Sequence, residues 1–285
     1  MPATTRRKMI VAGLLAAALP AALLANHSWG SYHWARTANP FDLKVGNNVT
    51  TTAWNSAFDQ SIVDWSQSSV LNLTEVAGTV NPKTCKATTG RVQVCNARYG
   101  NNGWLGIAGI SASGSHITKG YVKLNDTYFN TATYNSAAWR NLVTCQEIGH
   151  TLGLDHQDET FDNPNLGTCM DYTNSPNSNQ HPNAHDYNQL ETIYSHLDST
   201  TTVGALADYV DSATTAGGSQ PEGAFAVVDQ LDQNHPAAWG RLVHRSPSGG
   251  VETYVLDLGN GHRQITVVTW TLEEAARRRA QRAEE

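Results

Sequence analysis

Two histidines, a glutamate and a glutamine stand close together near the middle of the chain, at spacings that suit a metal centre. Gln146 and His150 are four residues apart, so they share one face of a predicted helix that also carries Glu147. Gly153 supplies a helix stop, after which His156 can return toward that face. Zinc prefers imidazole nitrogen as a ligand, and a carboxylate beside the ion can take a proton from water. The spacing therefore places residues that could bind a metal ion beside a carboxylate.

This segment resembles the signature of the metzincin zinc proteases, H-E-x-x-H-x-x-G-x-x-H. Glu147, His150, Gly153 and His156 match the signature in register, and Gln146 stands where its first histidine belongs. The resemblance covers roughly residues 30–200. It implies one catalytic Zn²⁺ ion, a general base, Glu147, and three ligands, His150, His156 and Gln146.

A second element resembles the Met-turn that lies beneath the metal in metzincins. It is the run Thr168–Tyr172, in which Met170 would be the Met-turn residue. Its Met-x-Tyr order is similar to that of the astacin-like subfamilies, so the resemblance implies that Tyr172 hydrogen-bonds the developing oxyanion. The two elements together predict a secreted, zinc-dependent metalloendopeptidase that hydrolyses an extended peptide or protein substrate.

Gln146 departs from the family pattern, because an amide oxygen is a weaker zinc ligand than an imidazole nitrogen. In a first interpretation Gln146 is a tolerated ligand of an active enzyme. In a second, His150 and His156 recruit another group, for which the candidates are His116, His181, His185 and Asp155. In a third, the chain is a catalytically impaired metzincin-like pseudoprotease that acts as an extracellular protein- or glycan-binding module. Glu147 favours an active enzyme, since its other use on a helix is only that of a solvated acid.

The four cysteines predict two disulfide bonds, because no C-x₂-C spacing supports a zinc site built from them. Cys85 and Cys95 flank a short loop, as the ends of a stapled hairpin do. Cys145 and Cys169 form the second pair, and each directly precedes a residue of the motifs above. A bridge between them would fasten the predicted active-site helix to the Met-turn.

Helices and strands alternate in the part of the chain that must position these residues. Apolar and aromatic positions from Trp54 to Trp65 predict one helix, and Ser136–Leu152 and Asp186–His196 predict two more. The predicted strands include Phe41–Val45, Val70–Leu73, Arg91–Val94, Trp104–Ile110 and Ile117–Leu124. The pattern predicts an α+β fold. The resemblance implies a metzincin-like domain with a twisted, mostly parallel sheet, an active-site helix, a Met-turn and a C-terminal helix. It also makes Ile117–Leu124 our candidate for the edge strand to which a substrate strand adds.

The composition changes after residue 200. We expect the metallopeptidase domain to occupy residues 26–200 and a flexible linker to occupy residues 201–220. Residues 221–285 then predict a small β-meander with strands near 239–244, 252–256 and 264–270, followed by a charged helical tail. No cysteine-switch propeptide precedes the first strand, so any latency is expected from another device, such as this C-terminal segment.

The first 25 residues predict a signal peptide, because Arg6, Arg7 and Lys8 precede an apolar run that ends at Ala25. The paired arginines are also compatible with the twin-arginine route. We therefore expect an extracellular chain that has no stable membrane insertion after signal removal.

Composition narrows the function further. The chain has 285 residues, of which 40% are hydrophobic, so it can bury a large core. Its formal charge of −6 argues against nucleic acid as a partner, and we expect a monomer. No phosphate-binding loop with lysine and no G-x-S-x-G elbow is present, which excludes a nucleotide enzyme or a serine hydrolase. Ca²⁺ has no support, since the acids at 158, 159 and 162 do not form a calcium loop.

Overall fold

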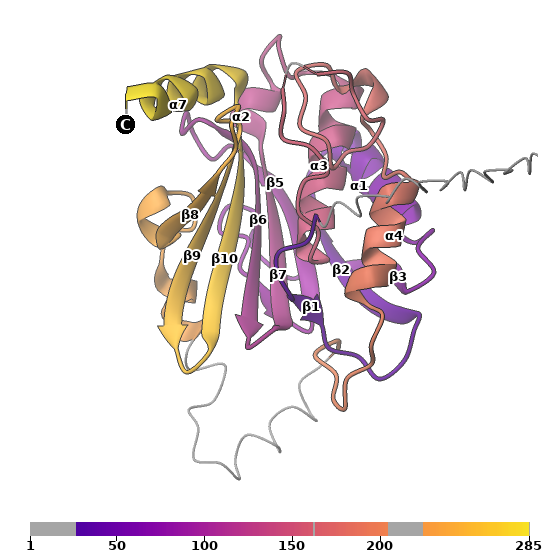
Figure 1. Cartoon of the computed structure of the whole chain (residues 1–285). Coiled ribbons are helices and arrows are strands. Elements are labelled where there is room, and N and C mark those ends of the chain that lie inside the picture. The colour runs from indigo at the N-terminus through magenta and orange to yellow at the C-terminus, as the bar shows by residue number, and fades with distance from the viewer. Residues whose placement is uncertain (1–26, 162, 205–224, 285) are drawn as a thin grey trace, which may run out of the picture.

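A large mixed β-sheet with helices on one face dominates the computed structural model, which describes residues 27–161, 163–204 and 225–284 (Figure 1). The expected α+β class is confirmed. The predicted signal peptide, residues 1–25, and most of the predicted linker, residues 201–220, lie outside the described residues. Within the described ranges, no helix is long and apolar enough to cross a membrane.

Eight strands follow one another across the sheet in the order β3-β2-β5-β7-β6-β10-β9-β8, and two short strands, β1 and β4, pair with β7. The first strands along the chain are β1 His33–Trp34, β2 Phe41–Asn48, β3 Leu71–Ala77, β4 Thr88–Thr89 and β5 Arg91–Ala97. The later ones are β6 Trp104–Ser113, β7 His116–Asn125, β8 Arg241–Arg245, β9 Val251–Gly259 and β10 His262–Trp270.

The expectation of a mostly parallel sheet holds within the described part of residues 26–200, where only the pairings of β7 with β6 and with the short strand β4 are antiparallel. β2 pairs in parallel with β3 and β5, and β5 pairs in parallel with β7. From β6 onward, however, the main ladders β6–β7, β10–β6, β10–β9 and β8–β9 are antiparallel. β8, β9 and β10 follow one another through short connections, which allow only antiparallel neighbours. The C-terminal meander thus continues the sheet of the first part of the chain.

The segment Ile117–Leu124, expected as the edge strand, is interior instead. It lies in β7, which pairs with β5 on one side and with β6 on the other. The strand beside it, β6, would be the edge of the sheet if the chain ended near residue 204. In the full chain β10 pairs along β6 over nine residues, from His262 opposite Ser113 to Trp270 opposite Trp104. The outer edge of β6 is therefore occupied by a later strand of the same chain.

Three helices cover one face of the sheet (Figure 1): α1 Thr52–Trp65, α3 Ala137–Thr151 and α4 Ala184–Ile193. Each begins at a side chain that accepts a backbone hydrogen bond, namely Thr51, Ser136 and Asn183. The short helices α2 Asp126–Phe129 and η1 Pro176–Ser178 lie in the connections. The predicted helices are confirmed within two or three residues at each end, and their apolar faces form the main core with the sheet.

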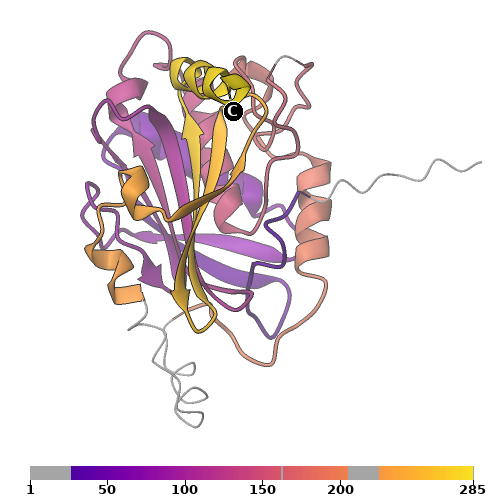
Figure 2. The ribbon, with the colours of Figure 1, turned by 60° about the vertical axis from the view of Figure 1, so that its left-hand side comes forward.

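The other face of the sheet carries a second, aromatic core. Trp104, Trp239, Tyr254 and Trp270 are buried together there, and the short helices η4 Val228–Gln230 and η5 Pro236–Ala238 lead into it. The tail helix α7 Leu272–Glu284 lies at the end of the sheet where β10 finishes (Figure 2). The guanidinium of Arg278 stacks 3.4 Å above the ring of Trp270, which fastens α7 to β10.

Candidate metal centre

The residues of the motif lie on the last turns of α3 and on the loop that follows it. Gln146, Glu147 and His150 are all buried on α3. Gly153 ends the helix region with a φ of 99°, and a Cβ at this position would stand 2.5 Å from the carbonyl oxygen of Tyr32. Glycine is therefore required at position 153 for two reasons: the positive φ of its backbone and the close approach of the N-terminal segment.

His150 and His156 come together as the sequence predicted they could. Their ring centroids are 4.5 Å apart, and the indole of Trp29 stacks on His150 at 5.1 Å. The Nδ1 atom of His150 donates to the carbonyl of Leu154 at 2.9 Å, which leaves a lone pair on Nε2. That Nε2 atom has no hydrogen-bond partner, and neither ring nitrogen of His156 has one. Burial, and the neighbouring His156, lower the pKa of His150 to about 3, so its imidazole is neutral as a metal ligand must be.

Glu147 points from α3 toward the sheet. A Cβ on Gly106 of β6 would stand 2.5 Å from Oε1 of Glu147, so only glycine leaves room for this carboxyl group. Both carboxyl oxygens are buried and neither has a hydrogen bond of ordinary geometry. The hydroxyl of Thr269 donates to Gln146 and also lies near enough to Glu147 to favour its charged form. Burial raises the pKa of Glu147 to about 8, so the carboxyl group keeps its proton at neutral pH in this arrangement.

Gln146 uses both ends of its amide within the fold. Its Nε2 donates to the carbonyl of Cys169 at 2.9 Å, and its Oε1 accepts from the hydroxyl of Thr269 at 3.2 Å. The side chain thus links α3 to the Met170 segment and to β10. This arrangement does not present Gln146 as a free ligand.

The segment around Met170 packs beneath α3. Met170 is buried, and a Cβ on Gly149 would stand 2.7 Å from its sulfur. Both predicted disulfide bonds are present, and the bond between Cys145 and Cys169 fastens this segment to α3. The other bond joins Cys85 to Cys95.

Tyr172 is buried against the C-terminal strands. Its hydroxyl donates to the carbonyl of Trp270 at 3.2 Å, and its ring lies directly over Gly250. Burial raises the pKa of Tyr172 above its ordinary value. In this arrangement the hydroxyl is committed to β10.

The surface beside His156 is acidic. A pocket of about 350 Å³ is lined by His27, Pro247 and the run from Asp155 to Thr160. Nδ1 of His156 lies 3.6 Å from Oδ1 of Asp155 and 3.9 Å from Oε1 of Glu159. The sequence interpretation had named Asp155 but had missed Glu159, whose spacing of three residues from His156 was the available signal.

The other groups considered as a third ligand are engaged elsewhere. Nε2 of His116 lies 3.2 Å from Asp198, Nδ1 of His181 lies 2.7 Å from Asp64, and Nδ1 of His185 lies 3.0 Å from Nε2 of His27. Among the described residues, His150 belongs to no group of three His, Cys, Asp or Glu side chains whose ligand atoms lie within 4.8 Å of one another.

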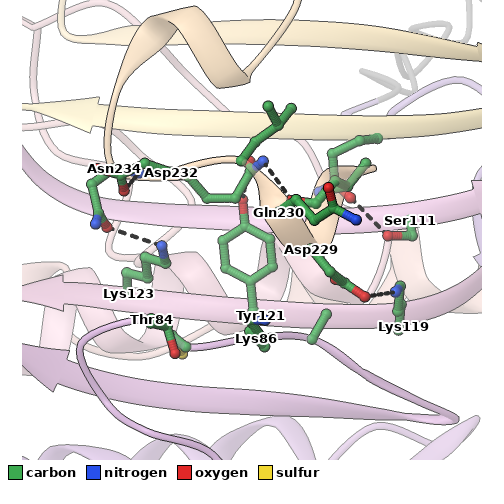
Figure 3. A pocket seen from close by; sticks show the side chains of 16 residues that line it. Thr84, Lys86, Ser111, Lys119, Tyr121, Lys123, Asp229, Gln230, Asp232 and Asn234 are labelled. Atoms are coloured by element: carbon green, nitrogen blue, oxygen red, sulfur yellow. Dashed lines mark hydrogen bonds and ion pairs between the residues drawn. The ribbon is translucent and has the colours of Figure 1, made fainter. Parts of the chain in front are cut away.

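A separate cavity of about 600 Å³ lies between the outer face of the sheet and the segment 228–234 (Figure 3). Lys119, Tyr121 and Lys123 reach it from alternate positions of β7, while Asp229 and Asn234 face them. Burial lowers the pKa of Lys123 to about 7. This cavity contains none of the residues of the zinc motif.

Comparison with known proteins assigns no family to the chain. No family model matches it, and no curated protein matches it. Two solved structures of myroilysin are distantly similar. The first has a TM-score of 0.34 and 14% sequence identity, and the match covers 56% of this chain and 82% of that one. The second has a TM-score of 0.32 and 14% identity, with coverages of 59% and 87%. Similarity at this level carries no weight for the function of this chain.

Proposed function

We propose that this chain is a zinc-dependent endopeptidase whose ion is bound by His150 and His156 and whose general base is Glu147. One observation carries the proposal. Thirteen buried side-chain nitrogen and oxygen atoms lack a hydrogen-bond partner among the described residues, and five of them belong to these three side chains. Buried polar atoms without partners are rare and call for an explanation such as a bound ion. A bound divalent cation would explain why the nitrogen atoms lack hydrogen-bond partners, and a catalytic role would explain why the carboxyl oxygens lack them.

The donor set fits zinc in part. Two imidazoles with free nitrogens suit the ion, whereas Gln146 does not fit as the third ligand because both ends of its amide are used within the fold. We assign the third position to one of the two carboxylates beside His156, Asp155 or Glu159. Separate Asp155→Asn and Glu159→Gln variants distinguish them, since only the ligand's loss should weaken zinc binding.

The chemistry follows from the places of the side chains. Zinc supplies Lewis acidity toward a peptide carbonyl and water. Glu147 would accept a proton from the attacking water and deliver it to the leaving amine. For this it must be deprotonated, which requires its surroundings to become more polar than they are beneath β10.

The C-terminal strands cover three parts of the proposed site: the edge of β6, Gln146 and Tyr172. β10 occupies the free edge of β6, Thr269 of β10 binds Gln146, and the carbonyl of Trp270 holds the hydroxyl of Tyr172. A substrate strand that adds to β6 would need the place of β10. The described arrangement is therefore a latent form of the proposed enzyme, and displacement of β10 would uncover it.

The decisive experiment compares cleavage of an unfolded protein by the mature chain and by Glu147→Gln, both with added zinc. The matched control is Glu191→Gln, which changes an exposed glutamate on α4. We expect Glu147→Gln to lose at least 100-fold in rate, in the range of general-base contributions, and Glu191→Gln to keep its rate. Equal and measurable cleavage by wild type and Glu147→Gln would contradict the proposal.

A second pair of variants tests the latent form. Val267→Asp places a charge at a fully buried position of β10, and Val243→Asp makes the same change at an exposed position of β8. We expect Val267→Asp to increase cleavage and Val243→Asp to leave it unchanged. If neither wild type nor Val267→Asp cleaves while both bind zinc, the endopeptidase assignment is wrong.

A binding module without catalysis is the second candidate, and the commitment of Gln146 to structural hydrogen bonds favours it. Binding of a protein or glycan would survive a His150→Gln/His156→Gln double variant, whereas metal-dependent cleavage would not.

A further inference from the structure

Three groups of His, Asp and Glu side chains bring possible metal-ligand atoms within 4.8 Å of one another among the described residues: His27 with His185 and Asp186, His33 with His196 and Asp198, and Asp155 with His156 and Glu159. We propose that the second group is a structural zinc site, with His116 beside it. Its residues lie on β1, at the start of β7 and on the segment that follows α4. The proposal is independent of the catalytic role assigned above, since none of its residues belongs to that motif.

The distances suit one ion. Nε2 of His33 and Nε2 of His196 are 3.2 Å apart, and they lie 3.4 and 3.7 Å from the same oxygen, Oδ1 of Asp198. Ligands bound at 2.0–2.1 Å in a tetrahedron stand about 3.3 Å from one another. Nε2 of His116 lies 3.2 Å from Oδ1 of Asp198, so a small movement of this half-exposed ring supplies a fourth ligand.

The hydrogen bond of His33 to the backbone directs its other ring nitrogen at the proposed ion. Nδ1 of His33 donates to the carbonyl of Ser31 at 2.7 Å, so Nε2 of the neutral ring carries a lone pair. Nε2 of His33 lies 3.4 Å from Oδ1 of Asp198 and 3.2 Å from Nε2 of His196, so the three atoms are close enough together to share one ion.

The carboxylate is held as a metal ligand usually is. Oδ2 of Asp198 accepts from Nη1 of Arg36 at 2.9 Å and from the backbone nitrogen of Arg36 at 3.2 Å. These bonds leave Oδ1 directed at the histidines. Arg36 also donates to the carbonyl of His196, so one buried guanidinium orients two members of the group. Hydrogen bonds that orient a ligating carboxylate in this way are typical of metal sites.

The chemistry of the group selects the ion. Two or three imidazoles with one carboxylate suit zinc, whereas calcium requires oxygen ligands throughout. The site is also reachable from solvent through His196, whose side chain is 53% exposed. The side chain of His33, by contrast, is only 4% exposed. Bound zinc would tie the end of the α4 segment to β1. The N-terminal segment just before β1 carries Trp29, the residue that stacks on His150.

The test measures zinc binding and melting temperature of the metal-stripped, mature full-length chain titrated with zinc chloride. The variant is His196→Gln, at an exposed ring whose loss should not prevent folding. The matched control is His235→Gln, which alters another exposed histidine 3.6 Å from an aspartate, Asp232. We expect His196→Gln to bind one zinc equivalent fewer than wild type, or to bind it at least tenfold more weakly, and to lose most of the zinc-induced rise in melting temperature. His235→Gln should match wild type.

A His150→Gln/His156→Gln variant separates this site from the proposed catalytic one. If the proposal is correct, this variant keeps the equivalent that His196→Gln loses. If His196→Gln binds zinc and gains stability as wild type does, the structural site does not exist, whatever the fate of the catalytic proposal. If zinc is lost only in the His196→Gln chain and not in the His150→Gln/His156→Gln chain, the structural site stands and the catalytic ligands are wrong.

Discussion

Replacing Gln146 by histidine restores the residue that the metzincin signature has at this position, and the structure predicts both a cost and a gain. The substitution removes the hydrogen bonds of Gln146 to Cys169 and Thr269, at 2.9 and 3.2 Å. Each such bond contributes about 0.5–1.5 kcal/mol, and a buried group left unpaired costs about 1–3 kcal/mol. We therefore expect the metal-free Gln146→His chain to be about 2–4 kcal/mol less stable than wild type.

The gain is a third imidazole on the face of α3 that carries His150, four residues away. Zinc should then bind at least about tenfold more tightly than it does to wild type, which equals 1.4 kcal/mol. The assay is urea unfolding in a chelator and in excess zinc, with zinc affinity measured by calorimetry. The control is Gln67→His, at an exposed position on the loop after α1.

A specific outcome would refute this reasoning. If Gln146→His loses stability in the chelator but shows no gain in zinc affinity over Gln67→His, position 146 does not face the ion. The centre would then not have the metzincin geometry, and the motif resemblance would be coincidental.

Three further predictions concern β10, the outer cavity and the disulfide beneath α3. Ala108 and Val267 are register partners on β6 and β10, so a disulfide between cysteines at both positions should form and lower cleavage by at least tenfold until it is reduced, with wild type in the same reductant as the reference. Burial lowers the pKa of Lys123 from 10.5 to about 7 in the folded chain. As the pH rises, Lys123 therefore loses its proton in the folded chain before it does in the unfolded chain, and the free energy of unfolding increases between about pH 7 and 10.5. Lys123→Met should therefore stabilise the chain below pH 7 by up to about 5 kcal/mol and by progressively less toward pH 10.5, and urea unfolding at pH 6 and 10 that shows no such difference would contradict it. The double variant Cys145→Ser/Cys169→Ser should lower the free energy of unfolding by about 2–4 kcal/mol, and an unchanged urea midpoint would show that this bridge does not stabilise the fold.

Local signals in the sequence predicted the elements that carry the motif. Ser136 caps α3, Gly153 follows it with a positive φ, and His156 returns to His150 as the spacing indicated. The helices α1 and α4 were predicted for a similar reason, since apolar periodicity is a property of neighbouring residues.

Long-range pairing could not be predicted in the same way. The choice of β6 as the partner of β10 joins residues about 150 positions apart, and the alternating pattern of β10 fits any free sheet edge. For this reason the sequence suggested a separate meander and an edge strand at Ile117–Leu124, where the structure has one continued sheet and an interior strand.

The same difference between short and long sequence separation applies to the proposed metal ligands. His150 and His156 were found because they are only six positions apart, whereas His33 and His196 are 163 positions apart and show no spacing that could link them. The role of Gln146 was also hidden, because its partner Thr269 lies 123 residues away on the strand that covers it.

Anomalous diffraction at the zinc edge from crystals of the mature chain grown with zinc tests the central claim most directly. We predict a zinc peak about 2.0–2.1 Å from Nε2 of His150 and from one ring nitrogen of His156, with Glu147 beside it. Zinc at full occupancy elsewhere on the chain, with no peak between these two histidines, would contradict the account.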